Sequence, residues 1–449
     1  MLSVKASDYG LLILVFALRF AAIALPGNLL QTDPDGYLRL ANGLVESGVY
    51  GLIDEAGRPH ATAFRPPLYP VLLAATIWCT GSASLWAIAS LHAGLATLSA
   101  ALLLSIGRSL NLRFATAACL LFSIDPLLIR QSQLIMTETV ATSVGLFSWW
   151  LMIYQERLRD PNQPSTLSPL TKWTFTLLIG ISFGIATLTR PTAIVWLALI
   201  VAYFVFRSTT QRTVLLRQAA WLCAGCAIVL IPWIARNREH FGKSIWATTH
   251  GGYTLLLANN SILYDHFATG SVSRDWDEDR FHREWAKRKA EAAQKPDYIQ
   301  RHREVVDDEF AQSVALDTIR QRPLMFAWSA VVRVGWLWTP LPNPRPDSWI
   351  KWPITVWYIW LFALALTGAW VLGRKSLEPT WWLGWLLLIS LTLVHSVYWS
   401  NMRMRAPALP LVYLLASYGA QSLMTHALGT LRTQSQPSPP SDYGKTARF

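Results

Sequence analysis

Residues 84–106 read SLWAIASLHAGLATLSAALLLSI and contain no Asp, Glu, Lys or Arg. A helix needs about 20 consecutive apolar residues to cross the hydrocarbon core of a bilayer. Similar runs recur along the whole chain, so the sequence predicts a polytopic membrane protein built of helices. The expected spans are residues 8–26, 84–106, 114–130, 134–153, 172–189, 190–206, 218–235, 353–373, 379–398 and 406–424.

The composition excludes most other classes of protein. Of the 449 residues, 52% are hydrophobic and only 15% are charged, whereas a soluble chain carries about 25% charged residues. A cytosolic enzyme, a disordered chain and a secreted disulfide scaffold are therefore excluded. The net charge of +12 is read as Lys and Arg on cytoplasmic loops, not as a nucleic-acid surface. The four Cys show no disulfide or zinc spacing, and Cys223 and Cys226 are expected to be small packing residues.

Two shorter runs, 66–80 and 324–339, are flanked by Arg and Pro, and hydropathy alone does not decide whether they cross. If both are interfacial helices on the outer face, the inner segments hold 14 Lys and Arg and the short outer segments hold seven. Positive residues concentrate on the cytoplasmic side. The sequence thus favours ten spans, an uncleaved first span and two cytoplasmic termini.

This topology divides the chain into four parts. Residues 1–235 form an N-terminal transmembrane module whose first outer loop, 27–83, carries candidate catalytic groups. Residues 236–352 form a periplasmic helical segment with a nearly balanced charged stretch, and a helix there should stop before Pro323. Residues 353–424 are C-terminal transmembrane helices, and 425–449 are expected to be a disordered cytoplasmic tail.

The first outer loop opens with Thr32-Asp33-Pro34-Asp35-Gly36-Tyr37. One interpretation makes Asp33 the N-cap of a helix with Pro34 at its first position. The other makes a carboxylate at the membrane surface accept a proton from an attacking hydroxyl. Both interpretations are open at this point.

Two further motifs place one charged group each near the outer face. Arg65 begins Arg65-Pro66-Pro67-Leu68-Tyr69-Pro70, where it either anchors the helix at headgroup level or holds a lipid phosphate. Glu138 begins an apolar helix after Thr137. Such an acid can complement the helix dipole. Alternatively it belongs to the functional site, because a carboxylate at membrane depth is costly and is kept where it has a role.

Several arginines on the outer face run against the positive-inside trend. They occur in the tight turn Thr189-Arg190-Pro191, in Arg403-Met404-Arg405-Ala406-Pro407 before the last span, and at Arg236. Arginines at such positions indicate anion binding, because they do not contribute to the membrane orientation of the chain. Together with the carboxylates, they suit a lipid-phosphate substrate whose reacting group stands outside the bilayer.

With these motifs the chain resembles the GT-C glycosyltransferases, and most of all the dolichyl-phosphate-mannose protein mannosyltransferase family with its bacterial relatives, the aminoarabinose transferases included. The resemblance rests on the order of five motifs: an Asp four residues before Tyr37, Arg65 to Pro70, Thr137-Glu138, Thr189 to Pro191, and Arg403 to Pro407. The chain departs from the family at one position: Pro34 follows Asp33, where the family often has Glu. Asp35 is therefore a second candidate for the catalytic role.

The resemblance implies a polyprenyl-phosphate sugar donor, attack at the anomeric carbon with inversion, and one carboxylate as general base. It makes Asp33 the first candidate for the base and Asp35 the second, with Glu138 orienting substrate hydroxyls. Arg65 and Arg405 lead as phosphate ligands. The further candidate ligands are Arg190, Arg236 and Arg403 for the phosphate, and Tyr37 and Tyr69 for the rest of the substrate.

The acceptor could be a glycan, a lipid or a protein, and the expected location is a bacterial inner membrane. No metal ligand set is expected, although two nearby carboxylates could bind a divalent cation. The rival interpretation is a transporter or lipid-linked sugar flippase, for which the mid-span charges would be Arg19 and, if the segment 324–339 crosses, Arg333. An enzyme should bring Asp33, Glu138 and Arg405 together at the outer face, and a transporter should show a central path. A non-catalytic assembly subunit is disfavoured by the two acidic motifs.

Overall fold

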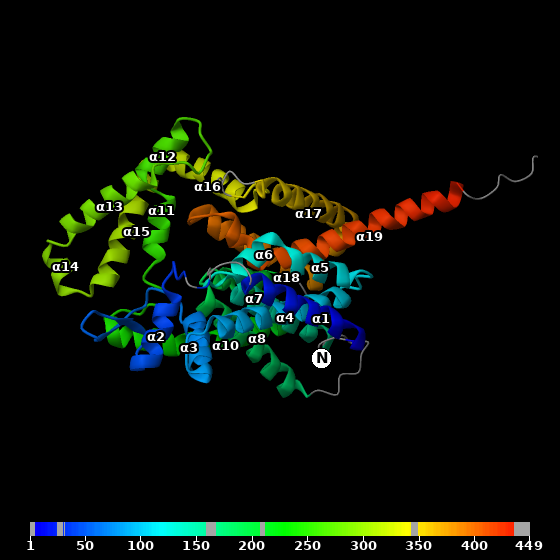
Figure 1. Cartoon of the computed structure of the whole chain (residues 1–449), viewed down its shortest axis with the longest axis horizontal. Coiled ribbons are helices and arrows are strands. Elements are labelled where there is room, and N and C mark those ends of the chain that lie inside the picture. The colour runs from blue at the N-terminus through cyan, green and yellow to red at the C-terminus, as the bar shows by residue number, and fades with distance from the viewer. Residues whose placement is uncertain are drawn as a thin grey trace, which may run out of the picture.

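The computed structural model describes residues 5–24, 30, 32–158, 168–206, 212–342 and 349–434. These residues form helices and one short antiparallel hairpin, in which Gly51 pairs with Ala61. Figure 1 shows a bundle of long helices with a smaller group of helices at one end. The all-α fold expected from the sequence is confirmed.

The bundle is built from most of the predicted apolar runs. Its elements are η1 (Ala6–Asp8), α1 (Tyr9–Ala24), α4 (Leu85–Ser109), α5 (Ala115–Ile124), α6 (Pro126–Ser132), α7 (Glu138–Leu158), α8 (Pro169–Thr189), α9 (Ala193–Phe206), α10 (Arg212–Phe241), α17 (Lys351–Leu372), η3 (Gly373–Leu377), α18 (Pro379–Val397), η4 (Met402–Ala408) and α19 (Leu409–Gln434).

The remaining elements gather at one end of the bundle (Figure 1). The first loop contains α2 (Tyr37–Ser47), β1 (Gly51–Ile53), β2 (Pro59–Ala61) and α3 (Leu68–Thr80). The cap, defined as residues 251–321, contains α11 (Gly251–Ala258), α12 (Ser261–Ala268), α13 (Glu278–Ala292), α14 (Pro296–Gln300) and α15 (Arg303–Gln321). The helix α16 (Pro323–Trp338) leads back to the bundle, and α15 stops before Pro323 as predicted.

Six helices are long and apolar enough to cross a membrane among the described residues, so the chain is an integral membrane protein. They are Ala6–Ala24, Leu85–Ser109, Leu170–Thr189, Arg212–Phe241, Lys351–Leu377 and Pro379–Val397. Helices α7 and α19 form at two more of the ten predicted spans, and α9 is a shorter apolar helix. The predicted span 114–130 is broken into α5 and α6, because Asp125 ends one helix and caps the next, its Oδ1 accepting from the Leu128 N–H.

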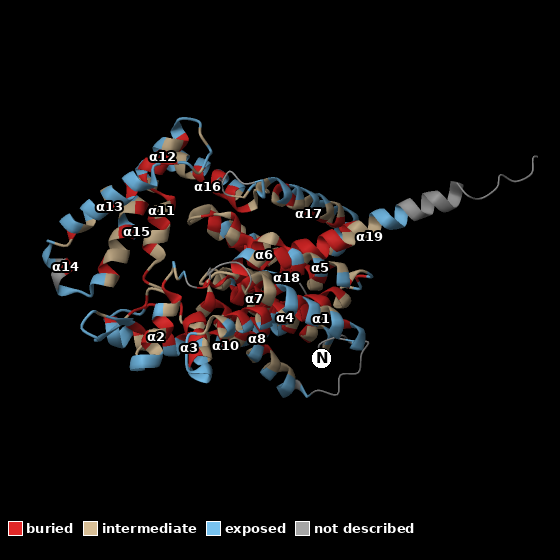
Figure 2. Cartoon of the chain, viewed as in Figure 1, coloured by how far each residue is buried: buried red, intermediate tan, exposed pale blue. Residues whose placement is uncertain are grey.

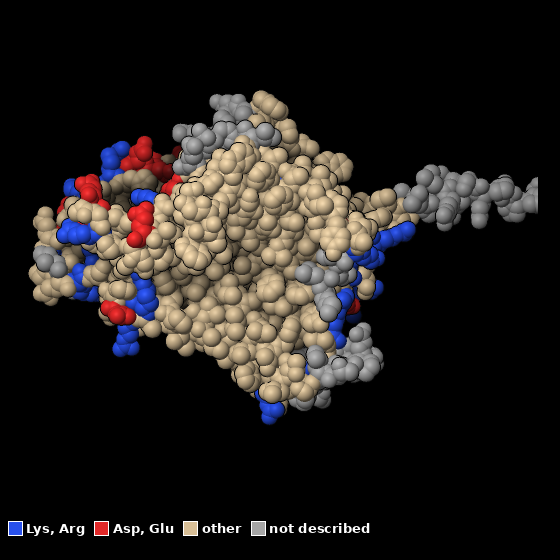
Figure 3. All heavy atoms as spheres, turned by 60° about the horizontal axis from the view of Figure 1, so that its bottom comes forward, with Lys and Arg blue, Asp and Glu red and all other residues tan. Residues whose placement is uncertain are grey.

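The surface of the bundle suits a lipid environment. Figure 3 shows a wide band without charged side chains between two charged ends. Large apolar side chains lie exposed on the bundle helices, Trp370 at 87% and Trp360 at 65%. Figure 2 shows buried residues gathered where the helices face one another. The outward apolar residues have no protein to cover them, as expected where lipid is the solvent.

Small residues let the longest helices pack closely. A side chain at Gly180 of α8 would collide with the backbone of α10 at Leu222 and Gly225, and one at Gly368 of α17 would collide with Leu415 of α19. Close backbone approach through small residues is typical of membrane helix pairs. Both expected packing cysteines lie on α10 as free thiols, Cys226 buried as expected and Cys223 exposed.

Three predicted boundaries need correction. Helix α2 begins at Tyr37 with Gly36 as its N-cap at φ 76°, so Asp33 is not the cap. Helix α10 continues through Pro232 to Phe241, so the boundary at residue 235 falls inside a helix. Helix α19 extends to Gln434, and the rest of the predicted tail, residues 435–449, lies outside the described residues.

The cap and the first loop are joined to each other and to α10. The carboxylate of Glu304 on α15 accepts hydrogen bonds from Thr62 Oγ1 (2.7 Å), from the Ala63 N–H (2.9 Å) and from Thr249 Oγ1. The guanidinium of Arg236 on α10 donates to the carbonyls of Thr62 (2.8 Å) and Tyr50 (2.6 Å). The first loop, the cap and the end of α10 therefore lie on one side of the membrane.

This arrangement predicts opposite sides for Asp279 and Arg212. Asp279 is exposed on the cap, and Arg212 begins α10, whose 30 residues span about 45 Å at about 1.5 Å per residue. In a background with the exposed Cys79 and Cys223 replaced by Ser, an impermeant maleimide added to sealed cells should label Asp279→Cys and not Arg212→Cys. Labelling of both variants from one side would contradict the fold's placement in the membrane.

Candidate functional site

Five charged side chains from distant parts of the sequence meet where the first loop joins the bundle. We call them the acid–arginine cluster: Asp35 and Arg65 from the first loop, Glu138 at the start of α7, Arg190 between α8 and α9, and Arg403 on η4. Two carboxylates and three arginines give the cluster a net charge of +1. Bringing these charged groups together out of water costs desolvation free energy.

Glu138 is the buried centre of the cluster. Its side chain is 2% exposed, and Oε1 lies 3.2 Å from Arg190 Nη1 and 3.7 Å from Arg403 Nε. The other oxygen, Oε2, is buried and has no hydrogen-bond partner among the described residues. The sequence correctly predicts that Glu138 begins a helix, and its arginine contacts show that it does more than complement the helix dipole.

Asp35 forms the more open edge of the cluster. Arg65 donates from Nη2 to Asp35 Oδ1 at 2.8 Å and from Nε to the Asp35 carbonyl at 3.0 Å. Arg403 Nη2 approaches Asp35 Oδ2 only to 4.0 Å, and the Arg403 side chain is 29% exposed. Arg403 therefore bridges the two carboxylates while keeping donor capacity for another anion.

Asp33 differs from Asp35 in its partners. Its Oδ2 accepts a hydrogen bond from the Arg39 N–H at 3.0 Å. Its Oδ1 is buried without a hydrogen-bond partner among the described residues, and none of those residues forms an ion pair with it. One oxygen thus positions the carboxylate at the start of α2, and the other is available to accept a proton.

Two tyrosines of the first loop, Tyr37 and Tyr69, pack together next to Arg65. Tyr37 and Tyr69 pack edge to face at 5.2 Å between ring centroids, and the Arg65 guanidinium lies 5.6 Å from the Tyr37 ring. Burial raises the pKa of Tyr37 to about 12, so its phenol stays protonated. The Tyr69 hydroxyl bonds to His92 Nε2 at 2.9 Å, and because His92 Nδ1 faces the Ser132 carbonyl, Nε2 is the acceptor.

Arg405 and Arg236 lie away from the cluster. Arg405 is fully buried, donates to the carbonyls of Leu337 (3.1 Å) and Thr339 (2.6 Å), and packs over the Tyr358 ring at 4.3 Å. Arg236 is engaged with the backbone of the first loop, as described above. The expected convergence of Asp33, Glu138 and Arg405 is therefore not observed, and the arginine that reaches Glu138 from η4 is Arg403.

Sequence reasoning missed His395 on α18, His250 before α11, and the two methionines of the cluster. Arg190 Nη2 lies 2.7 Å from Met404 Sδ, and Arg403 Nη1 lies 2.8 Å from Met136 Sδ. The His250 ring packs at 4.5 Å from Phe64, and burial, with Arg65 nearby, lowers its pKa to about 3. Met404 lies within the predicted motif Arg403 to Pro407, but its thioether carried no signal there, and the other three are single residues that no pattern marks.

The ion pairs of the cluster disfavour a divalent cation between Asp35 and Glu138. Both carboxylates of the cluster face arginines, and a cation would have to displace them against the cluster's net positive charge. Among the described residues no group of three His, Cys, Asp or Glu could hold a metal ion.

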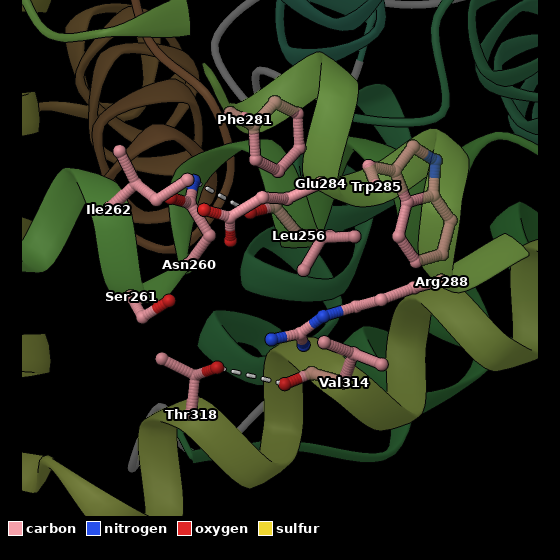
Figure 4. A pocket seen from close by; sticks show the side chains of 10 residues that line it. All are labelled: Leu256, Asn260, Ser261, Ile262, Phe281, Glu284, Trp285, Arg288, Val314 and Thr318. Atoms are coloured by element: carbon pink, nitrogen blue, oxygen red, sulfur yellow. Dashed lines mark hydrogen bonds between the residues drawn. The ribbon is translucent and has the colours of Figure 1, made fainter.

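A separate pocket lies in the cap and shares no residue with the cluster. Figure 4 shows it between α11, α12, α13 and α15, with the Arg288 guanidinium pointing in beside Ser261 and Thr318. Its apolar side is formed by Leu256, Phe281, Trp285 and Val314. It supplies an arginine, Arg288, that is exposed and remote from the cluster, and so serves as a control below.

Comparison with known families supports the resemblance found in the motifs. Residues 65–238 match the family described as dolichyl-phosphate-mannose-protein mannosyltransferase. This stretch includes Arg65, Glu138, Arg190 and Arg236. A search of curated proteins finds no match.

Solved structures support the fold over nearly the whole chain. An Archaeoglobus fulgidus oligosaccharyltransferase tethered to an acceptor peptide matches 96% of this chain with a TM-score of 0.56 and 15% identity. The same organism's oligosaccharyltransferase AglB, in complex with an inhibitory peptide and a dolichol-phosphate, matches 97% with a TM-score of 0.53 and 15% identity. This chain covers 51% and 53% of those two proteins, so it spans about half their length.

ArnT from Cupriavidus metallidurans, bound to undecaprenyl phosphate, aligns over 96% of this chain and 82% of its own at 15% identity, with a TM-score of 0.40. The archaeal matches confirm the helical membrane fold expected from the sequence, and the family match over residues 65–238 agrees with the resemblance found in the motifs.

The burial of Glu138 predicts a large stability effect. Glu138→Gln leaves Arg190 and Arg403 without their shared carboxylate, and breaking a buried ion pair costs about 3–5 kcal/mol. We expect the apparent melting temperature of the purified protein to fall by several degrees.

Glu309→Gln is the matched control. Glu309 also contacts two cations, Lys243 and Arg301, but its side chain is 31% exposed, where such pairs contribute about 1 kcal/mol or less. Equal losses of melting temperature in the two variants would show that Glu138 is not the buried centre described.

Proposed function

We propose that this protein is an inverting glycosyltransferase that moves a sugar from a polyprenyl-phosphate donor to an acceptor at the outer face of the membrane. The observation that carries the proposal is an arginine-rich cluster next to a carboxylate, Asp33, whose Oδ1 has no partner among the described residues. The arginines can hold a phosphate, and the Asp33 carboxylate can accept the proton of an attacking hydroxyl.

In the proposed reaction, an acceptor hydroxyl oxygen forms a bond to the anomeric carbon of the donor sugar. The bond from that carbon to the phosphate oxygen breaks, and the lipid phosphate leaves with the electron pair. The hydroxyl proton passes to Asp33 Oδ1. One base is sufficient because a phosphate leaves readily without a proton, unlike the leaving group in glycoside hydrolysis.

Arg403 is the first candidate to hold the leaving phosphate. It is the most exposed arginine of the cluster, and its Nη2 has only the 4.0 Å contact with Asp35. Arg65 and Arg190 stand on either side of it, paired with Asp35 and Glu138. As negative charge grows on the phosphate in the transition state, these donors stabilise it without first having to be ordered. Asp35 and Glu138 then act by positioning the arginines.

The comparisons support the choice of donor. The matching family is described as using dolichyl-phosphate-mannose, and one solved structure with this fold was obtained with a dolichol-phosphate and an inhibitory peptide. By analogy we propose a polyprenyl-phosphate sugar as donor, a glycan, lipid or protein as acceptor, and the inner membrane of a bacterium as the location. The cap, tied to the first loop through Glu304, would face the acceptor.

The contacts of Arg19 and Arg333 support the transporter alternative less well than the cluster supports a glycosyltransferase. Arg333 donates to the carbonyls of Ser396 and Ala258, and Arg19 donates to the carbonyl of Phe122. Both side chains are fully buried and hold the backbone of neighbouring helices. Arginines with such partners stabilise the bundle. Arg19 also lines a small cavity with Ser99 and Thr142, whereas a transport path needs an opening that continues across the membrane.

The general base gives the first functional prediction. Asp33→Asn keeps the acceptor for the Arg39 N–H but cannot take a proton, so kcat for sugar transfer should fall by about 10²–10⁴-fold with little change in melting temperature. Asp35→Asn should mainly raise KM for the donor, because it disturbs Arg65 and Arg403. Transfer at the wild-type rate by Asp33→Asn would remove Asp33 from the mechanism.

The phosphate ligand gives the second prediction. A charge-assisted hydrogen bond contributes about 1.5–3 kcal/mol, so Arg403→Ala should weaken binding of undecaprenyl phosphate to the purified protein by at least about tenfold. Arg403→Lys should recover part of that loss, since Lys keeps the charge without the planar fork.

Two other arginines serve as controls in the same titration. Arg288→Ala, in the cap pocket, should bind undecaprenyl phosphate as wild type does. Arg405→Ala should lower the melting temperature because it removes a buried group with two carbonyl partners. If Arg405→Ala lost binding at an unchanged melting temperature and Arg403→Ala kept it, the assignment would return to Arg405.

A further inference from the structure

We infer that His395 is a substrate-orienting residue whose Nε2 accepts a hydrogen bond from a hydroxyl of the bound sugar or acceptor. The inference rests on the proposed glycosyl transfer and adds to it a residue from α18 that no motif marks.

The hydrogen bond at Nδ1 fixes the tautomer of His395. Nδ1 lies 2.8 Å from the carbonyl oxygen of Trp399. A carbonyl oxygen only accepts, so Nδ1 carries the proton and donates it. In the neutral ring, Nε2 is then an acceptor with a free lone pair.

That lone pair has no partner in the part of the chain that the structure describes. Nε2 is buried, and the whole residue is 5% exposed. An unsatisfied buried polar atom costs about 1–3 kcal/mol, and native proteins carry few of them. A buried acceptor that the fold leaves unpaired is therefore a candidate to be paired by a ligand.

The surroundings of His395 are those of the acid–arginine cluster. Arg190 and Arg403 are the charged groups with which the ring interacts electrostatically. Helix α18 also packs against η4, which carries Arg403, and against α7, which begins with Glu138. The unpaired acceptor thus lies on a helix that packs against the element carrying Arg403, within electrostatic range of Arg190 and Arg403.

The turn that carries His395 is held in place from the cap side. Arg333 donates to the carbonyl of Ser396 at 2.7 Å, and Asn259 Nδ2 donates to the carbonyl of Val397 at 2.9 Å. With Trp399 fixing the ring itself, the position of Nε2 is set before any ligand arrives. Such preorganisation is what a group that orients a substrate requires.

The chemistry of the partner follows from the acceptor. Nε2 needs an O–H or N–H, and the phosphodiester of a polyprenyl-phosphate sugar carries neither. A hydroxyl of the donor sugar or of the acceptor does, and it would reach the ring while the phosphate lies on the arginines. His395 would then fix the rotation of the sugar about its bond to the phosphate.

Two substitutions separate this role from a structural one. His395→Asn places an amide N–H near the position of Nδ1, so it keeps the bond to Trp399 and removes Nε2. His395→Gln extends an amide oxygen toward the position of Nε2 and gives up the bond to Trp399. A purely structural histidine should tolerate Asn better than Gln, and a substrate-orienting one should tolerate Gln better than Asn in catalysis.

The experiment measures kcat/KM for sugar transfer, the melting temperature and undecaprenyl phosphate affinity for both variants. We expect His395→Asn to lose about 3- to 10-fold in kcat/KM, the equivalent of one neutral hydrogen bond, with melting temperature and affinity unchanged. His395→Gln should melt at a lower temperature and retain more of the transfer rate. Wild-type kcat/KM in His395→Asn would overturn the inference while leaving the proposed function intact. A wild-type protein that transfers no sugar would contradict the proposed function and, with it, this inference.

Discussion

The carboxylate of Glu138 is 2% exposed and must be neutralised where it lies, because an unpaired charge in a low-dielectric interior is too costly to keep. Arg190 and Arg403 provide that charge from the turn before α9 and from η4. Arg403 continues toward Asp35, which Arg65 holds from the first loop. One buried carboxylate thus fixes the relative positions of segments that lie more than 300 residues apart in the sequence.

The same pairing explains how a site for an anion can persist without its ligand. Three arginines with no counter-charge would repel one another. With two carboxylates among them, the arginines are ordered and keep an excess positive charge. Asp33 contributes the third carboxylate from outside the ion pairs, with one oxygen bound to the Arg39 N–H and the other free. Asp35 and Glu138 position arginines because arginine side chains contact them. Asp33 can accept a proton because no described arginine side chain pairs with it.

Much of the fold follows from the sequence, because apolar runs of span length leave few alternatives in a bilayer. The helix start at Glu138 and the tight turn at Arg190 were also predictable, since each lies at a sharp change from polar to apolar sequence. The start of α2 was not, because Gly36 adopts a positive φ and delays the helix past Asp33. The sequence favoured Arg405 over Arg403 as phosphate ligand, and our proposal favours Arg403 because it contacts Glu138 and Asp35. In a 3-10 helix such as η4, with about three residues per turn, residues two apart point to different sides, and an Arg-x-Arg pattern does not say which one faces the site.

The central claim is that the cluster around Glu138 receives the phosphate of a lipid carrier. The most direct measurement is an experimental structure of the protein in a lipid nanodisc with undecaprenyl phosphate bound. The account predicts phosphate density within hydrogen-bond distance of Arg403, beside Arg65 and Arg190, with the prenyl chain running along the apolar surface of the bundle. Phosphate density at Arg405, or in the middle of the bundle near Arg19, would contradict it.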